Sequence, residues 1–192
     1  MLNIEHKYKK KILRKFLIDR RNEYFSLFEK KNNSHIHIKT LLENIETCYV
    51  GSYFAFRNEI ITNSIHKLLL SLDFKICLPC VSNQDSNMIF RSWDLKDQLI
   101  KNKFGIMQPK ENTKEVVPEL IIVPIVGFSI SGYRLGYGGG YYDRYIQSRL
   151  TDDSLITVGL GYTFQEVKDI PYEKHDQKLN WILTEKYLYK VV

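Results

Sequence analysis

The sequence predicts an α/β protein, a three-layer α/β/α single domain around a central sheet that is mostly parallel or mixed. Segments with helical spacing of apolar residues alternate along the chain with short β-branched or aromatic segments, the order expected around a parallel sheet. The run 120–126 is apolar without interruption, as in a strand buried on both faces. The 192 residues suffice for one well-buried core, so we expect one domain over 1–192.

Each expected element has its own local pattern. Apolar residues at helical spacing predict helices over 4–30, 34–44, 58–72 and 140–150, and Ser34 is the expected cap of the second. β-Branched and aromatic residues predict strands over 47–56, 75–81, 88–90, 120–126, 156–161 and 181–184, with an edge strand at 187–191. Gly105 and Pro109 interrupt 94–114, where we expect a loop with one short helix.

The charge balance indicates an anionic ligand. The chain has 28 Lys and Arg against 22 acids, a net charge of +6, which suits a nucleotide, a nucleic acid or a polyglutamate. Basic residues throughout the first thirty positions exclude the apolar core of a signal peptide, and 120–126 is too short to span a bilayer. Three cysteines do not form a disulfide framework. We therefore expect a cytoplasmic protein.

The most informative segment is rich in glycine. Five of the ten glycines lie between Gly132 and Gly140, after a buried strand and at the start of a predicted helix. Glycines let backbone N–H groups turn toward a ligand, and a helix N-terminus adds partial positive charge, so the segment predicts a phosphate cradle. Arg134 can bind phosphate through two N–H groups, and Asp143 is placed to hold a metal ion. Glycines that serve only a tight crossover are the alternative, but one or two suffice there.

Two better-known phosphate loops do not fit this segment. A Walker A loop ends in Gly-Lys-Ser/Thr, and here Gly140 is followed by Tyr141. A dinucleotide fingerprint needs a glycine three residues after Gly138, where Tyr141 stands. The segment is therefore a different kind of phosphate-binding loop.

The stretch Arg134–Arg144, Arg-Leu-Gly-Tyr-Gly-Gly-Gly-Tyr-Tyr-Asp-Arg, resembles the hallmark of the 5-formyltetrahydrofolate cyclo-ligase family, also called methenyltetrahydrofolate synthetase. Further matches, among them 10–14, 53–62, 121–128 and 181–185, extend over nearly the whole chain. The resemblance implies formation of 5,10-methenyltetrahydrofolate from 5-formyltetrahydrofolate, with ATP as co-substrate and Mg²⁺ as cofactor. In that reaction the formyl oxygen is phosphorylated, the ring closes and phosphate leaves. Such chemistry needs positioning and charge neutralisation rather than a nucleophilic side chain.

The resemblance also implies roles for individual residues. It assigns catalysis to Arg134 and Asp143, magnesium to Asp143 and Asp176, and the folate to Phe54 and Glu59, whose carboxylate suits the N–H groups of a pterin. The residues that match ATP contacts are Lys10, Lys11, Arg14, Arg134, Leu135, Gly136, Tyr137, Gly138, Gly139, Gly140, Tyr141 and Tyr142. The expected partners are ATP and 5-formyltetrahydrofolate, with or without a polyglutamate tail, and neither nucleic acid nor membrane; we expect a monomer.

The residues alone leave other interpretations open. Lys10 and Arg14 lie four apart, which also describes a solvated basic helix face, and Glu59 would suit a helix start. Cys77-Leu-Pro-Cys80 has redox or zinc spacing, but on an apolar strand we expect two buried thiols. The sequence also departs from the family pattern: Tyr137 and Gly139 stand where some relatives have a basic residue, and Ser129 and Asn180 where acids are usual.

Two other classes of function compete with the cyclo-ligase. A nucleic-acid-binding relative of the same fold would fit the basic, tyrosine-rich composition, although no ribonucleoprotein-type motif or zinc finger is present. It would have no need of the four residues that the resemblance places in the site, Arg134, Glu59, Asp143 and Asp176. Another small-molecule kinase would keep the glycine loop and lose the turn around Glu59.

Overall fold

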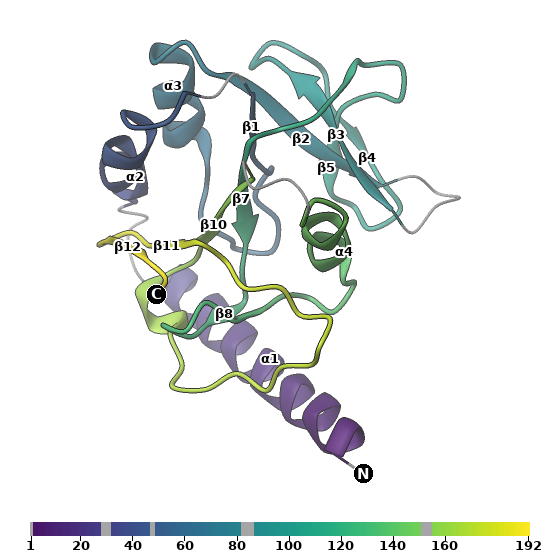
Figure 1. The fold of residues 1–192 in the computed structure, drawn as a ribbon, viewed down its shortest axis with the longest axis vertical. Helices are drawn as coiled ribbons and strands as arrows, with labels where there is room; N and C mark the ends of the chain where they lie inside the picture. Colours follow the sequence, from purple (N-terminus) through teal and green to yellow (C-terminus); the bar gives the residue numbers. More distant parts are fainter. Residues whose placement is uncertain (1, 28–31, 47–48, 82–86, 151–154) are drawn as a thin grey trace.

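An eight-stranded mixed sheet forms the centre of the fold, in the order β12-β11-β10-β7-β1-β2-β3-β6 (Figure 1). The computed structural model describes residues 2–27, 32–46, 49–81, 87–150 and 155–192. The strands are β1 (Tyr49–Gly51), β2 (Lys75–Val81), β3 (Met88–Trp93), β6 (Glu115–Val116), β7 (Leu120–Pro124), β10 (Ile156–Leu160), β11 (Trp181–Leu183) and β12 (Leu188–Lys190). Strands β2, β1, β7, β10 and β11 run parallel; β3 and β12 pair antiparallel with the two ends of this set, and β6 pairs antiparallel with β3. The predicted mixed sheet is confirmed.

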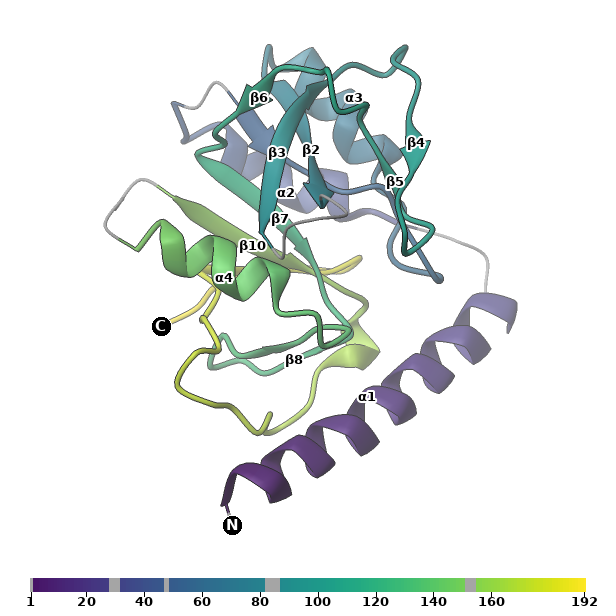
Figure 2. The same cartoon turned by 90° about the vertical axis from the view of Figure 1, so that its right-hand side faces the viewer.

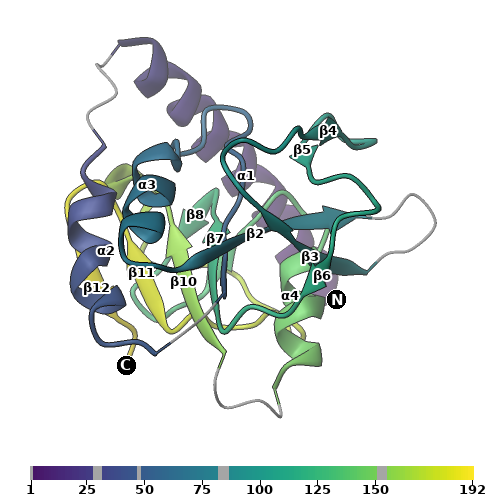
Figure 3. The same ribbon diagram turned by 90° about the horizontal axis from the view of Figure 1, so that it is seen from above.

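Helices cover both faces of this sheet. α2 (Ser34–Leu42) and α3 (Asn63–Ser71) lie on one face and α4 (Tyr141–Ser148) on the other (Figure 3). Along β7 the side chains alternate between the two layers: Leu120 packs in the core under α2 and α3, and Ile121 in the core under α4. The apolar run therefore forms a strand buried on both faces, as predicted.

The long N-terminal helix α1 (Leu2–Leu27) crosses one end of the sheet, beside the β8 hairpin (Figure 2). Its Leu17 is fully buried against Val126 and Leu135. The approach is so close that a Cβ atom added to Gly127 would lie 2.5 Å from Leu17 Cδ1. Residues spaced around Leu17 at helical intervals, namely Lys10, Arg14 and Arg21, consequently share the face that α1 turns toward the rest of the protein.

Four local predictions were wrong. Ser34 is the first residue of α2 and not its cap, because the helix begins one residue earlier than expected, with Asn33 as N-cap. Residues 94–114 contain a hairpin of β4 (Ile100–Lys101) and β5 (Met107–Gln108) instead of a helix, because the Asn102 side chain accepts two backbone N–H groups of the turn. The predicted helix 58–72 begins only at Asn63, since Asn58 has a positive φ of 61°. Within 49–56 only β1 is a strand; 47 and 48 lie outside the described residues.

Short elements without a sequence pattern surround the glycine-rich segment. β8 (Gly127–Phe128) and β9 (Arg134–Leu135) form a hairpin between β7 and the glycines, and a 3₁₀ helix, η1, spans Thr163–Gln165. The side-chain amide of Gln165 donates to the carbonyls of Ile125 and Val126 at 2.9 and 2.7 Å. The chain after β7 is therefore held in place by a contact 39 to 40 residues away in sequence.

The two cysteines of β2 are buried, as predicted. Cys77 and Cys80 are free thiols, and burial raises the pKa of both, that of Cys80 to about 11. Because the thiolate is the reactive form, we expect neither to be alkylated in the folded protein and both to react in denaturant. Pulse alkylation followed by peptide mass mapping checks this, and separates both thiols from Cys48. Rapid labelling of either in native buffer would contradict it.

Candidate active site

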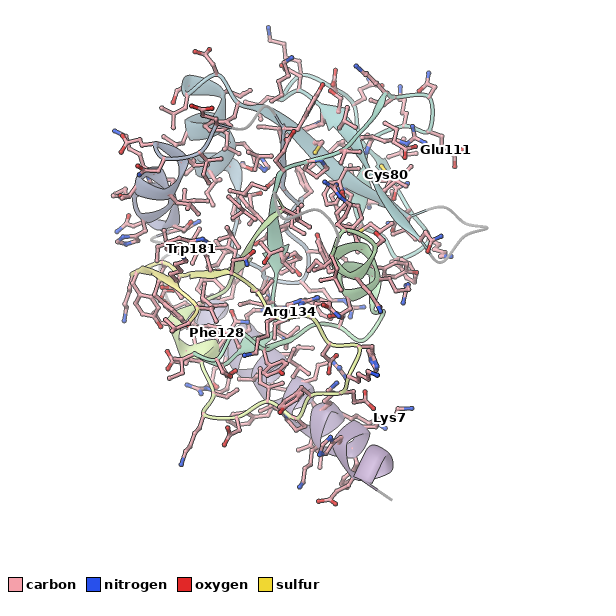
Figure 4. The ribbon with its side chains drawn as sticks, viewed as in Figure 1. Lys7, Cys80, Glu111, Phe128, Arg134 and Trp181 are labelled. Atoms are coloured by element: carbon pink, nitrogen blue, oxygen red, sulfur yellow. The ribbon has the colours of Figure 1, made fainter. Side chains whose placement is uncertain are left out.

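The predicted site residues come together at the carboxyl ends of the parallel strands, where open α/β sheets bind ligands. β1 leads into the turn that carries Glu59, and β7 leads through the β8–β9 hairpin into the glycine loop, 136–140. Arg134 lies between α4 and α1 at this end of the sheet (Figure 4). The segment 173–177 completes the site from the C-terminal part of the chain. In the part of the chain that the structure describes, no helix has the length and apolar character needed to cross a membrane.

The glycine loop has the backbone that a phosphate cradle requires. Gly138 and Gly140 have φ values of +98° and +66°, a region that other residues rarely adopt. Gly140 is the N-cap of α4, and as a glycine it has no side chain that could accept the first N–H groups of the helix. The first N–H groups of α4 thus open toward the loop, where the helix dipole favours an anion.

Helix α1 brings one of the predicted cations to this loop and another to the segment 173–177. Arg14 donates from Nε to the Gly136 carbonyl at 2.6 Å, and its Nη2 lies 3.5 Å from where a Gly138 Cβ would be. Lys10 donates to Asp176 Oδ2 at 2.5 Å and lies 3.4 Å from Glu173 Oε2. Lys10 and Arg14 therefore do not form a solvated basic helix face, the alternative interpretation of their spacing.

Other predicted nucleotide contacts are placed differently. The Lys11 side chain is exposed and lies one position off the face that carries Lys10. The Leu135 side chain is buried in the core with Leu17, so only its backbone faces the loop. Tyr141 packs edge-on against Phe104, with ring centroids 6.0 Å apart.

Arg134 and Asp143 form a nearly buried ion pair. Arg134 Nη2 donates to Asp143 Oδ1 at 2.7 Å, and Nη1 donates to the carbonyl of Gln177 at 2.5 Å. The Gln177 N–H donates to the same carboxylate oxygen at 3.1 Å. Burial lowers the pKa of Arg134, while the charges of Asp143 and Asp176 oppose that shift. The pair therefore ties α4 and β9 to the segment 173–177, with Asp176 in electrostatic reach.

Carboxylates suited to a magnesium ion lie beside this pair. Ligand atoms of Glu173, His175 and Asp176 lie within 4.8 Å of one another, and Asp143 lies outside that group. Magnesium prefers carboxylate oxygens, which Asp143, Asp176 and Glu173 supply. Glu173 was missed in the sequence; its N–H donates to Asp176 Oδ2 at 2.6 Å, and this Glu-x-x-Asp turn spacing could have revealed it.

Glu59 is buried among polar side chains. Its side chain is 6% exposed and accepts the Phe56 N–H at 2.9 Å. Burial raises the pKa of Glu59 to about 7, against the Phe56 hydrogen bond and the charges of Arg21 and Arg57. Phe54, the other predicted folate contact, is partly exposed and packs edge-on against Trp93. Glu59 precedes α3 by a turn rather than starting it.

Sequence reasoning missed Arg21. Its guanidinium is 1% exposed and donates from Nη2 to the hydroxyl of Tyr137, which in turn hydrogen-bonds to Glu59. The position follows Arg14 by seven residues, so helical spacing could have placed it on the same face. Tyr142 lies nearby: burial raises its pKa, Glu59 raises it further, and Arg134 opposes the shift. Tyr142 is thus within electrostatic reach of both Glu59 and Arg134.

Two departures from the family pattern have local explanations. Asn180 Oδ1 accepts the N–H and the hydroxyl of Thr157, both at 2.8 Å, and so joins β10 to the start of β11. The Ser129 hydroxyl shares a hydrogen bond with Ser131 at 2.9 Å within the β8–β9 turn. Neither role requires an acid.

Known proteins are similar to this chain in sequence and in fold. The sequence model of the 5-formyltetrahydrofolate cyclo-ligase family matches residues 6–185. The chain is 34% identical over 152 residues to the 5-formyltetrahydrofolate cyclo-ligase of Haemophilus influenzae, covering 77% of this chain and 81% of that protein. It is 29% identical over 140 residues to the one of Escherichia coli K12, covering 70% and 76%. The NMR structure of 5,10-methenyltetrahydrofolate synthetase from Aquifex aeolicus has a TM-score of 0.73 and 26% identity, covering 95% of this chain and 92% of that one.

Proposed function

The chain belongs to the 5-formyltetrahydrofolate cyclo-ligase family and is an enzyme of that family, and we propose that it converts 5-formyltetrahydrofolate to 5,10-methenyltetrahydrofolate at the cost of one ATP, with magnesium. One observation carries the proposal: α1, the glycine loop and the segment 173–177 bring the cations and carboxylates named above to one end of the sheet. We also propose a cytoplasmic monomer that accepts folates with or without a polyglutamate tail.

The proposed reaction has two steps. The formyl oxygen attacks the γ-phosphorus of ATP, the bond from that phosphorus to the bridging oxygen breaks, and ADP leaves. The resulting N5-iminium phosphate is then attacked at carbon by N10, which loses its proton. The carbon–oxygen bond breaks, phosphate departs, and the methenyl bridge remains. Each step needs alignment of the two substrates and neutralisation of phosphate charge, and none needs a covalent enzyme intermediate.

The loop and α1 would bind the nucleotide. Backbone N–H groups of 136–142 would bind the phosphate tail together with the guanidinium of Arg14, which already lies against the Gly136 carbonyl, and the charge of Arg134 would add to the attraction. Asp143 and Asp176 would hold magnesium, which neutralises phosphate oxygens when bound. Lys10, which neutralises Asp176 as the side chains lie, would turn its ammonium toward the phosphates. Charge then stays balanced with and without nucleotide.

Glu59 and Phe54 would bind the pterin. A buried carboxylate with a fixed orientation accepts the amino and ring N–H groups of the pterin together, and Phe54 adds an apolar contact.

We expect purified protein to form the methenyl product from 5-formyltetrahydrofolate only when ATP and magnesium are both present. The product's near-ultraviolet absorbance, followed in parallel with ADP release, measures this at a ratio of one to one. Omission of folate, ATP or magnesium, each in turn, is the control. Folded protein that gives no ATP-dependent product would overturn the proposal, and ADP release without product would indicate a different kinase.

A further inference from the structure

The guanidinium of Arg21 is buried without a complete set of partners. Its side chain is 1% exposed, and Nε and Nη1 have no hydrogen-bond partner among the described residues. Within that part of the chain it also makes no direct ion pair. Arginine remains charged in proteins, and a buried charge is costly unless an opposite charge compensates it.

The carboxylate that Arg21 reaches is Glu59, through one hydroxyl group. Arg21 donates to the oxygen of Tyr137, and the Tyr137 hydroxyl hydrogen-bonds to Glu59. A phenol can accept one hydrogen bond and donate another, so the three groups form a continuous relay. The positive charge of Arg21 lowers the pKa of Glu59 against the effect of burial.

Other groups facing Glu59 do not replace this contact. Arg57 also lowers the pKa of Glu59, but its side chain lies over the rings of Phe56 and Tyr137. Tyr53 and Tyr142 are neutral phenols, and the charge of Glu59 raises the pKa of both. The Tyr53 hydroxyl donates to the carbonyl of Ile60. Among these groups only Arg21 joins a full charge to Glu59 through a hydrogen-bonded side chain.

We propose that Arg21 is a positioning residue for folate recognition: through the Tyr137 hydroxyl it orients the Glu59 carboxylate and supplies its countercharge. This inference rests on the proposed function, because it takes Glu59 as the contact to the pterin. A carboxylate accepts two N–H groups only while it is ionised, so loss of Arg21 should weaken folate binding before it affects phosphoryl transfer.

The test compares Arg21→Met, which keeps the length and removes the charge, with Tyr137→Phe, which removes only the hydroxyl. Arg20→Met, an exposed neighbour on α1, is the matched control. At pH 7 and saturating ATP, Arg21→Met should raise the KM for 5-formyltetrahydrofolate by about tenfold or more, the size expected for a hydrogen bond to a charged group. kcat and the KM for ATP should change less than about twofold, and Tyr137→Phe should fall between wild type and Arg21→Met.

The pH profile separates positioning from packing. Folate KM in the wild type should rise as the pH falls through about 7, the pKa of Glu59. Arg21 lowers that pKa, so in Arg21→Met the same rise should begin at higher pH, and folate binding should recover at alkaline pH. A damaged fold would not recover in this way, and Arg20→Met should follow the wild-type curve.

A double-mutant cycle with Glu59→Gln tests whether Arg21 acts on folate binding through Glu59. If Arg21 acts through Glu59, Arg21→Met should have little further effect on folate KM in the Glu59→Gln background. An equal effect in both backgrounds, or an unchanged KM and pH profile, would overturn the inference. Should Arg21→Met fail to fold, Tyr137→Phe completes the same cycle. Wild-type protein without ATP-dependent turnover would instead overturn the proposed function.

Discussion

Asp143→Asn should lower kcat by about two to three orders of magnitude and leave the protein folded. The amide keeps the size of the side chain and one acceptor oxygen for Arg134 and for the Gln177 N–H, which lie at 2.7 and 3.1 Å. It removes the negative charge with which we expect Asp143 to hold magnesium. Loss of one preorganised electrostatic contact at a reacting centre has about this effect.

The measurement is turnover as a function of magnesium concentration, with thermal unfolding of the same samples. Asp143→Asn should need more magnesium for half-maximal turnover, whereas Glu119→Gln, a carboxylate just before β7 at the opposite end of the sheet, should match the wild type. If turnover and stability fell together in Asp143→Asn and the magnesium requirement stayed the same, the ion pair would serve packing only.

Asparagine is the better test than alanine because of the Arg134 partner. The Arg134 side chain is 5% exposed, and alanine at 143 would leave this charge without its carboxylate. Breaking a buried pair in that way costs about 3–5 kcal/mol, enough to obscure an effect on catalysis. From the sequence, which does not reveal the Arg134 partner, Asp143→Ala is expected to lower turnover far more than stability; the structure indicates that it would lower both.

Glu59→Gln is the second change with a large expected effect, and it should act on folate binding and on stability in opposite directions. Gln offers both a donor and an acceptor to the pterin N–H groups, so the folate KM should rise by about tenfold to a hundredfold. Stability at pH 8 should increase, because a buried carboxylate that ionises at high pH is removed.

The sign and size of the stability change in Glu59→Gln follow from the pKa of Glu59, which burial raises from 4.5 to about 7. Since the folded-state pKa lies above the unfolded one, the proton favours the folded state. The contribution of protonated Glu59 to the free energy of unfolding is fully present below pH 4.5 and is lost as the pH rises through 7. The shift from 4.5 to about 7 corresponds to about 3 kcal/mol.

Urea unfolding from pH 4 to pH 8 measures the difference in the free energy of unfolding between Glu59→Gln and the wild type. The free energy of unfolding of Glu59→Gln should match that of the wild type near pH 4 and exceed it by about 3 kcal/mol at pH 8. Glu119→Gln should show no such pH-dependent gain. A constant difference between wild type and Glu59→Gln at every pH would show that folding does not raise the pKa of Glu59.

The larger elements of the fold could be predicted because each carries a local pattern. Leu120–Pro124 is apolar at every position up to its final proline, and α3 repeats apolar residues at helical spacing. The hairpins β4–β5 and β8–β9 were missed, since strands of two residues are too short to show a period. Their turns depend on single residues such as Asn102.

The sequence by itself determined the kinds of chemistry available to this protein: a glycine loop at a helix start, cations four residues apart on one helix face, and carboxylates near the loop. Only the tertiary structure decided which of these groups meet. Lys10 and Asp176 are 166 residues apart, Arg21 and Tyr137 are 116 apart, and Lys11 makes none of these contacts. The physical reason is that local patterns reflect the periodicity of burial along one element. The charge state and the partners of a polar side chain depend instead on groups that packing brings from elsewhere in the chain.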